Sequence, residues 1–163
     1  MDFADLYGRY SQDVFRFAYF LSGNRELAED IASETFARAL TVGNHLRSGS
    51  VKAYLLAIAR NLYLDFARTQ GRTTSLSEAH DSTPDDAPDP EAIAASRLDL
   101  GAAMHALQQM PEGERAALLM AGVDGLPHEE IAAALGCSTA AVKVRIHRAR
   151  LRLRQLTAQR SSP

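Results

Sequence analysis

Six basic side chains lie between Thr139 and Arg154, and no acid occurs from Thr139 to the last residue. Lys and Arg bind phosphate, so this stretch could bind nucleic acid. At about 100° per residue, the apolar residues of the stretch share one narrow helical face. This apolar seam consists of Val142, Ile146, Ala149 and Leu153. The pattern predicts a helix that packs along one side and leaves its basic side to solvent or to a ligand.

The opposite side of this predicted helix is mixed in character. Its reading face consists of Lys143, Val144, His147 and Arg148. Arg150 and Arg154 flank this face on one side, and Arg145 and Arg152 flank it on the other. In a helix that enters the major groove, flanking cations contact phosphates and the outward face contacts base edges. The alternative is a solvated basic helix at the end of the chain.

The residues just before the basic helix would have to position it. Pro127 suits a first helical turn, and Glu129 and Glu130 favour a helix N-terminus. Gly136 can adopt a positive φ and end that short helix, and either Ser138 or Thr139 can cap the next one. Two helices joined by a tight turn predict a helix-turn-helix.

Charge divides the 163-residue chain into three segments, although its net charge is only −2. Residues 1–70 carry eight basic and eight acidic side chains. Residues 71–95 carry one basic and six acidic side chains, and residues 96–163 carry nine basic and six acidic ones. A neutral block, an acidic linker and a basic block suggest two small domains joined by a spacer. The single cysteine, Cys137, excludes an internal disulfide and a multi-cysteine zinc site.

Apolar residues recur at steps of three and four along the N-terminal block, which predicts helices over 2–21, 25–42 and 51–70. In the third helix, Asn61, Asp65 and Arg68 form a polar ridge beside the apolar stripe. Residues 71–90 have the composition of a flexible linker, helix resumes near residue 90, and a further helix is expected over 112–123 after Pro111. No segment alternates with period two, so the fold is predicted to be all-α.

Three segments resemble extracytoplasmic-function sigma factors of bacterial RNA polymerase. The stretches ELAEDIASETFARAL and YLLAIARNLYLDFAR look like sigma regions 2.2 to 2.4. The stretch MPEGERAALLMAGVDGLPHEEIAAALGCSTAAVKVRIHRARLRLRQL looks like sigma region 4. The resemblance implies region 2 over 1–70, a flexible acidic linker over 71–95, and region 4 over 96–160. The protein is therefore expected to be an alternative sigma factor that binds core RNA polymerase.

The resemblance also implies which residues contact promoter DNA. The −35 element would be read by the basic helix, through Lys143, Val144, Arg145, His147, Arg148 and Arg150. The −10 element would be bound and melted by the third helix and the loop before it, through His45, Arg47, Arg60, Asn61, Asp65 and Arg68. An amide such as Asn61 can both donate to and accept from the edge of a flipped base.

Partners follow from the same resemblance. Asp30, Glu34 and Phe36 would dock on core RNA polymerase, and a dedicated anti-sigma factor would hold the protein inactive. We expect no metal and no cofactor. The five histidines are scattered, and the chain has no Gly-rich phosphate loop and no nucleophile motif, so we expect no enzymatic activity.

Two other interpretations stay open at this point. The chain could be a conventional helix-turn-helix regulator that binds duplex DNA without polymerase, although the region 2 segments argue against this. It could also be a sigma-like mimic that only binds an anti-sigma factor, although the intact basic helix argues against that. No leader segment and no apolar run long enough to span a bilayer are present, which predicts a cytoplasmic protein without membrane insertion.

Overall fold

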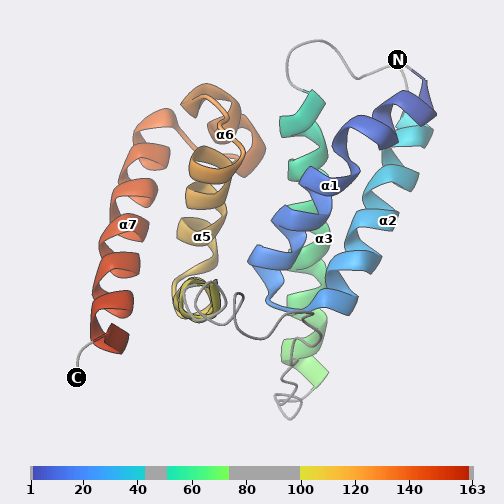
Figure 1. Ribbon diagram of the computed structural model, residues 1–163. Helices are drawn as coiled ribbons and strands as arrows, with labels where there is room; N and C mark the ends of the chain where they lie inside the picture. The colour runs from blue at the N-terminus through green and yellow to red at the C-terminus, as the bar shows by residue number, and fades with distance from the viewer. Residues whose placement is uncertain (1, 43–50, 74–99, 162–163) are drawn as a thin grey trace.

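The computed structural model describes residues 2–42, 51–73 and 100–161, and every regular element within these ranges is helical. The N-terminal bundle comprises α1 (Phe3–Ser22), α2 (Arg25–Val42) and α3 (Val51–Thr73) (Figure 1). The C-terminal unit comprises a helix at residues 100–108, α5 (Glu112–Leu118), the π-helix η3 (Leu119–Val123), α6 (His128–Leu135) and α7 (Thr139–Ser161). The all-α prediction is confirmed. The predicted loop at 43–50 and most of the acidic linker lie outside the described residues.

Local chemistry explains where the helices begin and end. Asp2 caps α1 by accepting a hydrogen bond from the backbone N–H of Asp5 at 3.0 Å. Gly136 adopts a φ of 70° and ends α6, as the helix-turn-helix prediction requires. Of the two predicted caps for α7, the structure uses Ser138, whose Oγ accepts from the N–H of Ala141 at 3.0 Å. Pro127 precedes α6 instead of opening it.

The core of the N-terminal bundle comes from the apolar stripes that helical periodicity predicts. Fully buried side chains include Phe17 and Leu21 of α1 and Leu55 of α3. Two apolar residues share the helical spacing of these stripes but are exposed, Leu40 at 56% and Phe66 at 38%. Leu40 lies in the last turns of α2, and Phe66 lies toward the end of α3, which extends beyond its neighbours (Figure 1). Periodicity gives the face of a helix but not how far its packing partners extend.

The segment predicted as one helix over 112–123 contains a change of helix type. After Leu118 the backbone widens into η3, and the N–H of Asp124 donates to the carbonyl of Leu119, five residues back, at 3.1 Å. A π-turn holds more residues than an α-turn, so it changes the direction in which the following residues point. Here it ends directly at Asp124, whose side chain reaches the N-terminal bundle.

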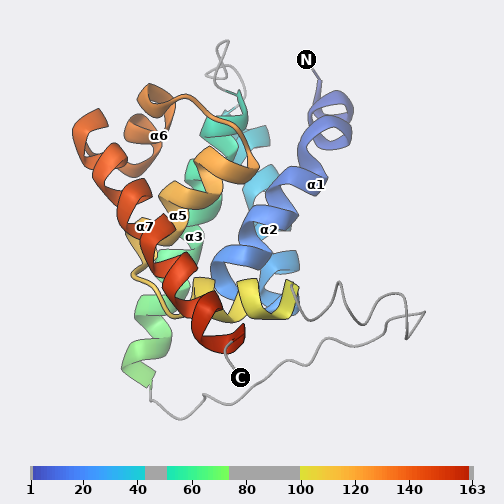
Figure 2. The ribbon, with the colours of Figure 1, turned by 60° about the vertical axis from the view of Figure 1, so that its left-hand side comes forward.

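The N-terminal bundle and the C-terminal unit pack against each other. Helices α1 and α3 contact α5, η3 and α6, and buried residues of both units belong to one continuous hydrophobic cluster (Figures 1 and 2). The structure shows a closed arrangement, in which buried side chains of both units share one hydrophobic cluster.

Candidate nucleic-acid interfaces

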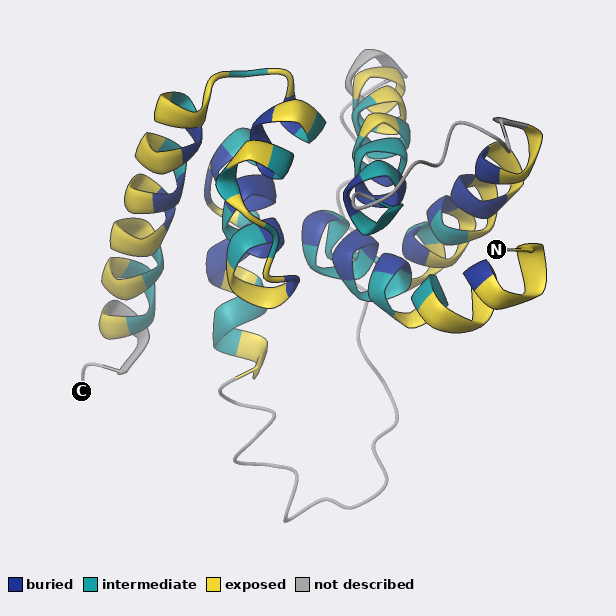
Figure 3. Cartoon of the chain, turned by 90° about the horizontal axis from the view of Figure 1, so that it is seen from above, coloured by how far each residue is buried: buried dark blue, intermediate teal, exposed yellow. Residues whose placement is uncertain are grey.

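The apolar seam of α7 packs on the C-terminal unit. Val142, Ile146 and Ala149 are at most 4% exposed, and Leu153 is half-buried. Figure 3 shows the exposed side of α7 facing away from the other helices along its length. The seam predicted from the 100° periodicity is therefore confirmed by burial.

The reading face of α7 points to solvent. Lys143, Val144, His147 and Arg148 are all exposed, and so is Arg150 on the adjacent flank. The structure thus brings together on one open surface the residues expected to read the −35 element, with one exception described next. An α-helix with this exposure can enter a major groove without rearrangement of its own unit.

The flank of α7 nearest α5 is engaged within the protein. Arg145 is half-buried, and its Nη1 lies 3.4 Å from the position that a Cβ on Gly113 would occupy. Arg152 pairs with Glu114 of α5, with Nε 2.7 Å from Oε1. These contacts fix the flank in place, and the pair partly neutralises the charge of Arg152.

The predicted polar ridge of α3 is also present on the surface. Asn61, Asp65 and Arg68 are exposed, and Asp65 accepts a hydrogen bond from Arg68. Arg60 differs from them, because its side chain is only 13% exposed and its guanidinium pairs with Glu112 of α5. Its Nε and Nη2 donate to the two carboxylate oxygens at 2.6 and 2.7 Å. His45 and Arg47, predicted to act with this helix, lie outside the described residues.

The residues expected to dock on polymerase divide between surface and core. Asp30 and Glu34 are exposed on α2, where Glu34 pairs with Arg38 at 3.2 Å. Phe36 is only 2% exposed, and its ring packs edge-on against Tyr7 at 5.1 Å between centroids. This corrects the expectation that Phe36 presents its side chain to a partner. The reason is geometric, because two residues along a helix is a rotation of about 200°, which places Phe36 opposite Glu34.

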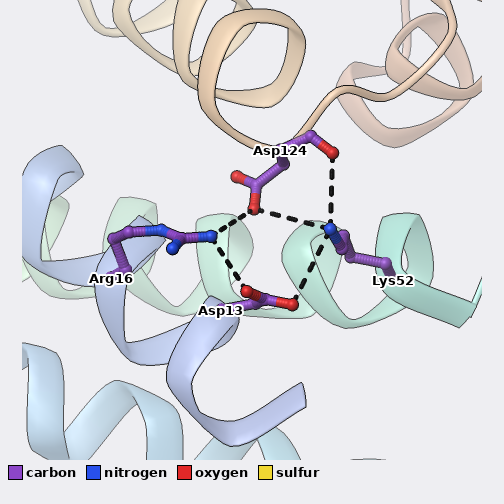
Figure 4. A network of polar contacts seen from close by, with 4 residues as sticks. All are labelled: Asp13, Arg16, Lys52 and Asp124. Atoms are coloured by element: carbon purple, nitrogen blue, oxygen red, sulfur yellow. Dashed lines mark hydrogen bonds and ion pairs between the residues drawn. The ribbon is translucent and has the colours of Figure 1, made fainter. Parts of the chain in front are cut away.

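A cluster of four charged residues joins the two units (Figure 4). Asp124 Oδ1 lies 3.4 Å from Arg16 Nη2 and 4.0 Å from Lys52 Nζ, which also donates to the Asp124 carbonyl at 3.3 Å. Asp13 contacts the same two cations, at 2.9 Å from Arg16 and 3.7 Å from Lys52. The two acids therefore share two cations, one from α1 and one from α3.

Burial dominates the electrostatics of Asp124, whose side chain is fully shielded from solvent. Desolvation raises the pKa of its carboxyl group above the ordinary value of 3.8, although Lys52 and Arg16 act to lower it and Asp13 adds to the rise. Oδ2 of the same carboxylate has no hydrogen-bond partner. The ionised form of Asp124 is thus incompletely compensated in the closed arrangement.

Two further side chains of the C-terminal unit contact the N-terminal bundle. Gln108 donates to the carbonyl of Phe20 at 2.8 Å, which satisfies a backbone acceptor left free at the end of α1. Gly23 follows at a φ of 71°, and a Cβ there would lie 3.0 Å from the Gln108 side chain. Arg115 is buried, donates to the carbonyl of Met110 at 3.0 Å, and lies 6.0 Å from the centre of the Tyr63 ring.

Sequence reasoning found none of these contacts between the units. No sequence pattern marks Lys52 as a partner of Asp124, or Glu112 as a partner of Arg60, since the two members of each pair are far apart along the chain. Only the Pro111 helix break placed Glu112 correctly, at the start of a helix.

Two known protein families match the N-terminal bundle and the C-terminal unit separately. Residues 6–73 match the family Sigma-70 region 2, and residues 100–153 match the family Sigma-70, region 4. The ECF RNA polymerase sigma factor EcfG of Rhodopseudomonas palustris is 32% identical over 86% of this chain and 76% of its own length. This chain belongs to the extracytoplasmic-function sigma factors. These are non-enzymatic transcription factors that act with RNA polymerase.

Other relatives are similar over nearly all of this sigma factor. The ECF sigma factor SigE of Mycolicibacterium smegmatis is 40% identical over 97% of this chain, which spans 62% of the length of that relative. The solved structure of the sigma factor RpoE in complex with the anti-sigma factor NepR, from Bartonella quintana, has a TM-score of 0.80 and 29% identity, covering 95% of this chain and 96% of that one. CnrH, in complex with the cytosolic domain of CnrY, shares the fold with a TM-score of 0.72 and 23% identity, over 96% of this chain and 88% of that one.

The described residues contain neither a membrane-spanning helix nor a cluster of metal-ligating side chains. Among them, no helix combines the length and apolar character needed to cross a bilayer. Within the same ranges, no group of three or more His, Cys, Asp or Glu side chains is arranged to hold a metal ion.

Proposed function

We propose that this sigma factor binds core RNA polymerase, directs it to promoters with −10 and −35 elements, and helps to open the DNA. The observation that carries the proposal is the open reading face of α7 on a region 4 unit, in the same chain as a region 2 bundle. A regulator that binds only duplex DNA has no need of the second unit. A mimic that binds only an anti-sigma factor has no need of a basic reading face.

Each DNA surface has a proposed task. Lys143, His147 and Arg148 of α7 contact base edges of the −35 duplex, Val144 makes an apolar contact, and Arg150 and Arg145 approach phosphates. A bidentate Arg or Lys contact to guanine contributes about 1–3 kcal/mol of discrimination. On α3, Asn61 contacts a flipped −10 base while Asp65, Arg60 and Arg68, with His45 and Arg47 of the preceding loop, line the path of the single strand.

The remaining partners complete the proposal. Asp30 and Glu34 form the exposed part of the polymerase-docking surface, and Phe36 supports it from below. An anti-sigma factor inhibits the protein, as the RpoE–NepR complex illustrates for a relative of similar structure. The domains extend over 1–70 and 96–160, joined by an acidic linker at 71–95, and the protein acts in the cytoplasm.

Reconstitution with bacterial core polymerase tests the proposal. Promoter fragments are selected from a random DNA pool, and transcript start sites are mapped with and without the protein. We expect initiation at discrete sites, and we expect Asn61→Ala to reduce promoter opening more than duplex binding. Gln70→Ala is the matched control, because Gln70 is an exposed amide about 180° around α3 from Asn61.

The alternatives give different results in the same experiment. A protein that binds duplex DNA but never recruits polymerase is a conventional regulator. A protein that does neither, yet binds an anti-sigma factor, is a mimic.

A further inference from the structure

We propose that the closed arrangement is autoinhibitory, with Glu112 of region 4 occupying the Arg60 guanidinium that region 2 needs for promoter DNA. The proposal rests on the proposed function, in which α3 binds the −10 element. It adds a means of regulation that lies within this chain and needs no second protein.

The Arg60–Glu112 pair resembles a contact between arginine and a phosphate. Both nitrogens of the guanidinium fork donate to both oxygens of the carboxylate, at 2.6 and 2.7 Å. The same planar fork binds two oxygens of a DNA phosphate in the same geometry. One guanidinium edge cannot hold both anions, so Glu112 and the DNA backbone compete for it.

Region 4 also restricts access to α3 in the neighbourhood of Arg60. Glu112 is the first residue of α5, and α6 packs against α3 as well. Arg60 is only 13% exposed in this arrangement, whereas its neighbour Asn61 is exposed. A single strand that follows α3 could therefore reach Asn61 but would lack the cation beside it until region 4 moves.

One buried carboxylate limits how strongly the two regions hold together. Asp124 is buried against Lys52 and Arg16, yet one of its oxygens has no hydrogen-bond partner and burial raises the pKa of its carboxyl group. Closure is therefore less favourable with ionised Asp124 than with its protonated form, while the Arg60–Glu112 pair favours closure. Because the cost of burying ionised Asp124 offsets part of the gain from the Arg60–Glu112 pair, a competing ligand can open the interface.

A relative has a similar arrangement while bound to an anti-sigma factor. The alignment with RpoE in its NepR complex covers 95% of this chain at a TM-score of 0.80, so both units superimpose together. That sigma factor is bound to an anti-sigma factor, and its two regions are placed much as they are here. In this chain the same placement occurs with interactions from the protein itself.

The first measurement is the distance between the regions in the full-length free protein. Cys137→Ser removes the native thiol, and Glu26→Cys on α2 with Ala158→Cys on α7 provide exposed labelling positions for single-molecule energy transfer. We expect one dominant short distance. Glu112→Gln should increase the open fraction about tenfold, as expected for loss of a charge-assisted hydrogen-bond pair.

Two further variants make the distance measurement specific. Glu129→Gln is the matched control, since it removes the same charge from an exposed position of α6 and should leave the distance unchanged. Exchange of the pair, Arg60→Glu with Glu112→Arg, should restore the short distance. An open fraction that does not change in Glu112→Gln overturns the proposal, whether or not the protein initiates transcription.

The second measurement is binding of a fluorescent single-stranded DNA pool of mixed sequence by the same proteins. Glu112→Gln should bind about tenfold more tightly than the wild type, and the exchanged pair should not show this gain because it lacks Arg60. Opening without any gain in DNA binding would overturn the claim that Glu112 competes with DNA. Failure of the proposed function would appear separately, as absence of initiation with core polymerase.

Discussion

The two helices proposed to contact DNA differ in what the rest of the protein does to them. Helix α7 packs on one side only, against α5 and α6 of its own region. Helix α3 packs against α1 and α2 of its own region and against α6 of the other region. As a result Arg148 of α7 is exposed, whereas Arg60 of α3 pairs with Glu112. The same residue type is available for DNA on one helix and occupied on the other.

This difference suggests that the two promoter elements are recognised under different conditions. Under the proposed roles, recognition of the −35 duplex needs only the fold of region 4, whereas recognition of the −10 strand also needs the regions to separate. Three mutational comparisons, from the largest expected effect to the smallest, probe the two helices and the interface between the regions.

The first comparison separates support of the reading face from the reading face itself. Ile146→Ala removes a side chain that is 4% exposed in the seam of α7, and we expect it to lower the free energy of unfolding by about 2–5 kcal/mol. Val144→Ala, on the exposed side of the same helix, should change it by less than about 0.5 kcal/mol. Thermal unfolding followed by circular dichroism measures both. Equal effects would mean that α7 also packs through its reading face.

The second comparison sets Arg148 against Arg60 in duplex binding. Arg148→Ala should weaken binding of the free protein to selected −35 duplex by about 1–3 kcal/mol and relax preference for one base pair. Arg60→Ala should leave this binding nearly unchanged, because Arg60 lies on the other region and is already paired. Fluorescence anisotropy at constant salt measures both affinities. A comparable loss in Arg60→Ala would contradict the separation of the two surfaces.

The third comparison concerns the pH dependence of the interface between the regions. The pKa of Asp124 is raised above 3.8 in the folded protein. Between pH 3.8 and this higher folded pKa, the native state therefore binds more protons than the unfolded chain. Stability contributed by this group is therefore present at lower pH and lost as the pH rises through its folded pKa. Asp124→Asn cannot titrate and should lack this contribution to the slope. Unfolding midpoints of both proteins are measured from below pH 3.8 to neutrality. As the pH rises, the midpoint of the wild type should fall relative to that of Asp124→Asn. A constant difference would contradict the prediction.

Much of each proposed DNA surface could be predicted from the sequence, because it depends on residues close together in the chain. Burial confirms the seam of α7, and exposure confirms the ridge of Asn61, Asp65 and Arg68. The same helical pattern places Phe36 on the apolar side of α2, opposite Glu34. The family resemblance instead assigned Phe36 to the docking surface, and its burial favours the helical pattern.

Contacts between distant segments account for what the sequence left open. The exposure of Leu40 and Phe66 depends on where neighbouring helices end, and the π-turn at Leu119–Val123 has no periodic pattern that predicts it. The sequence by itself determined the helical class, the two regions and the open reading face of α7, because short-range periodicity and charge encode them. Only the tertiary structure decided that Glu112 meets Arg60 and that Asp124 is buried between Arg16 and Lys52, because those pairs are 52, 108 and 72 residues apart and their contact depends on how the regions pack.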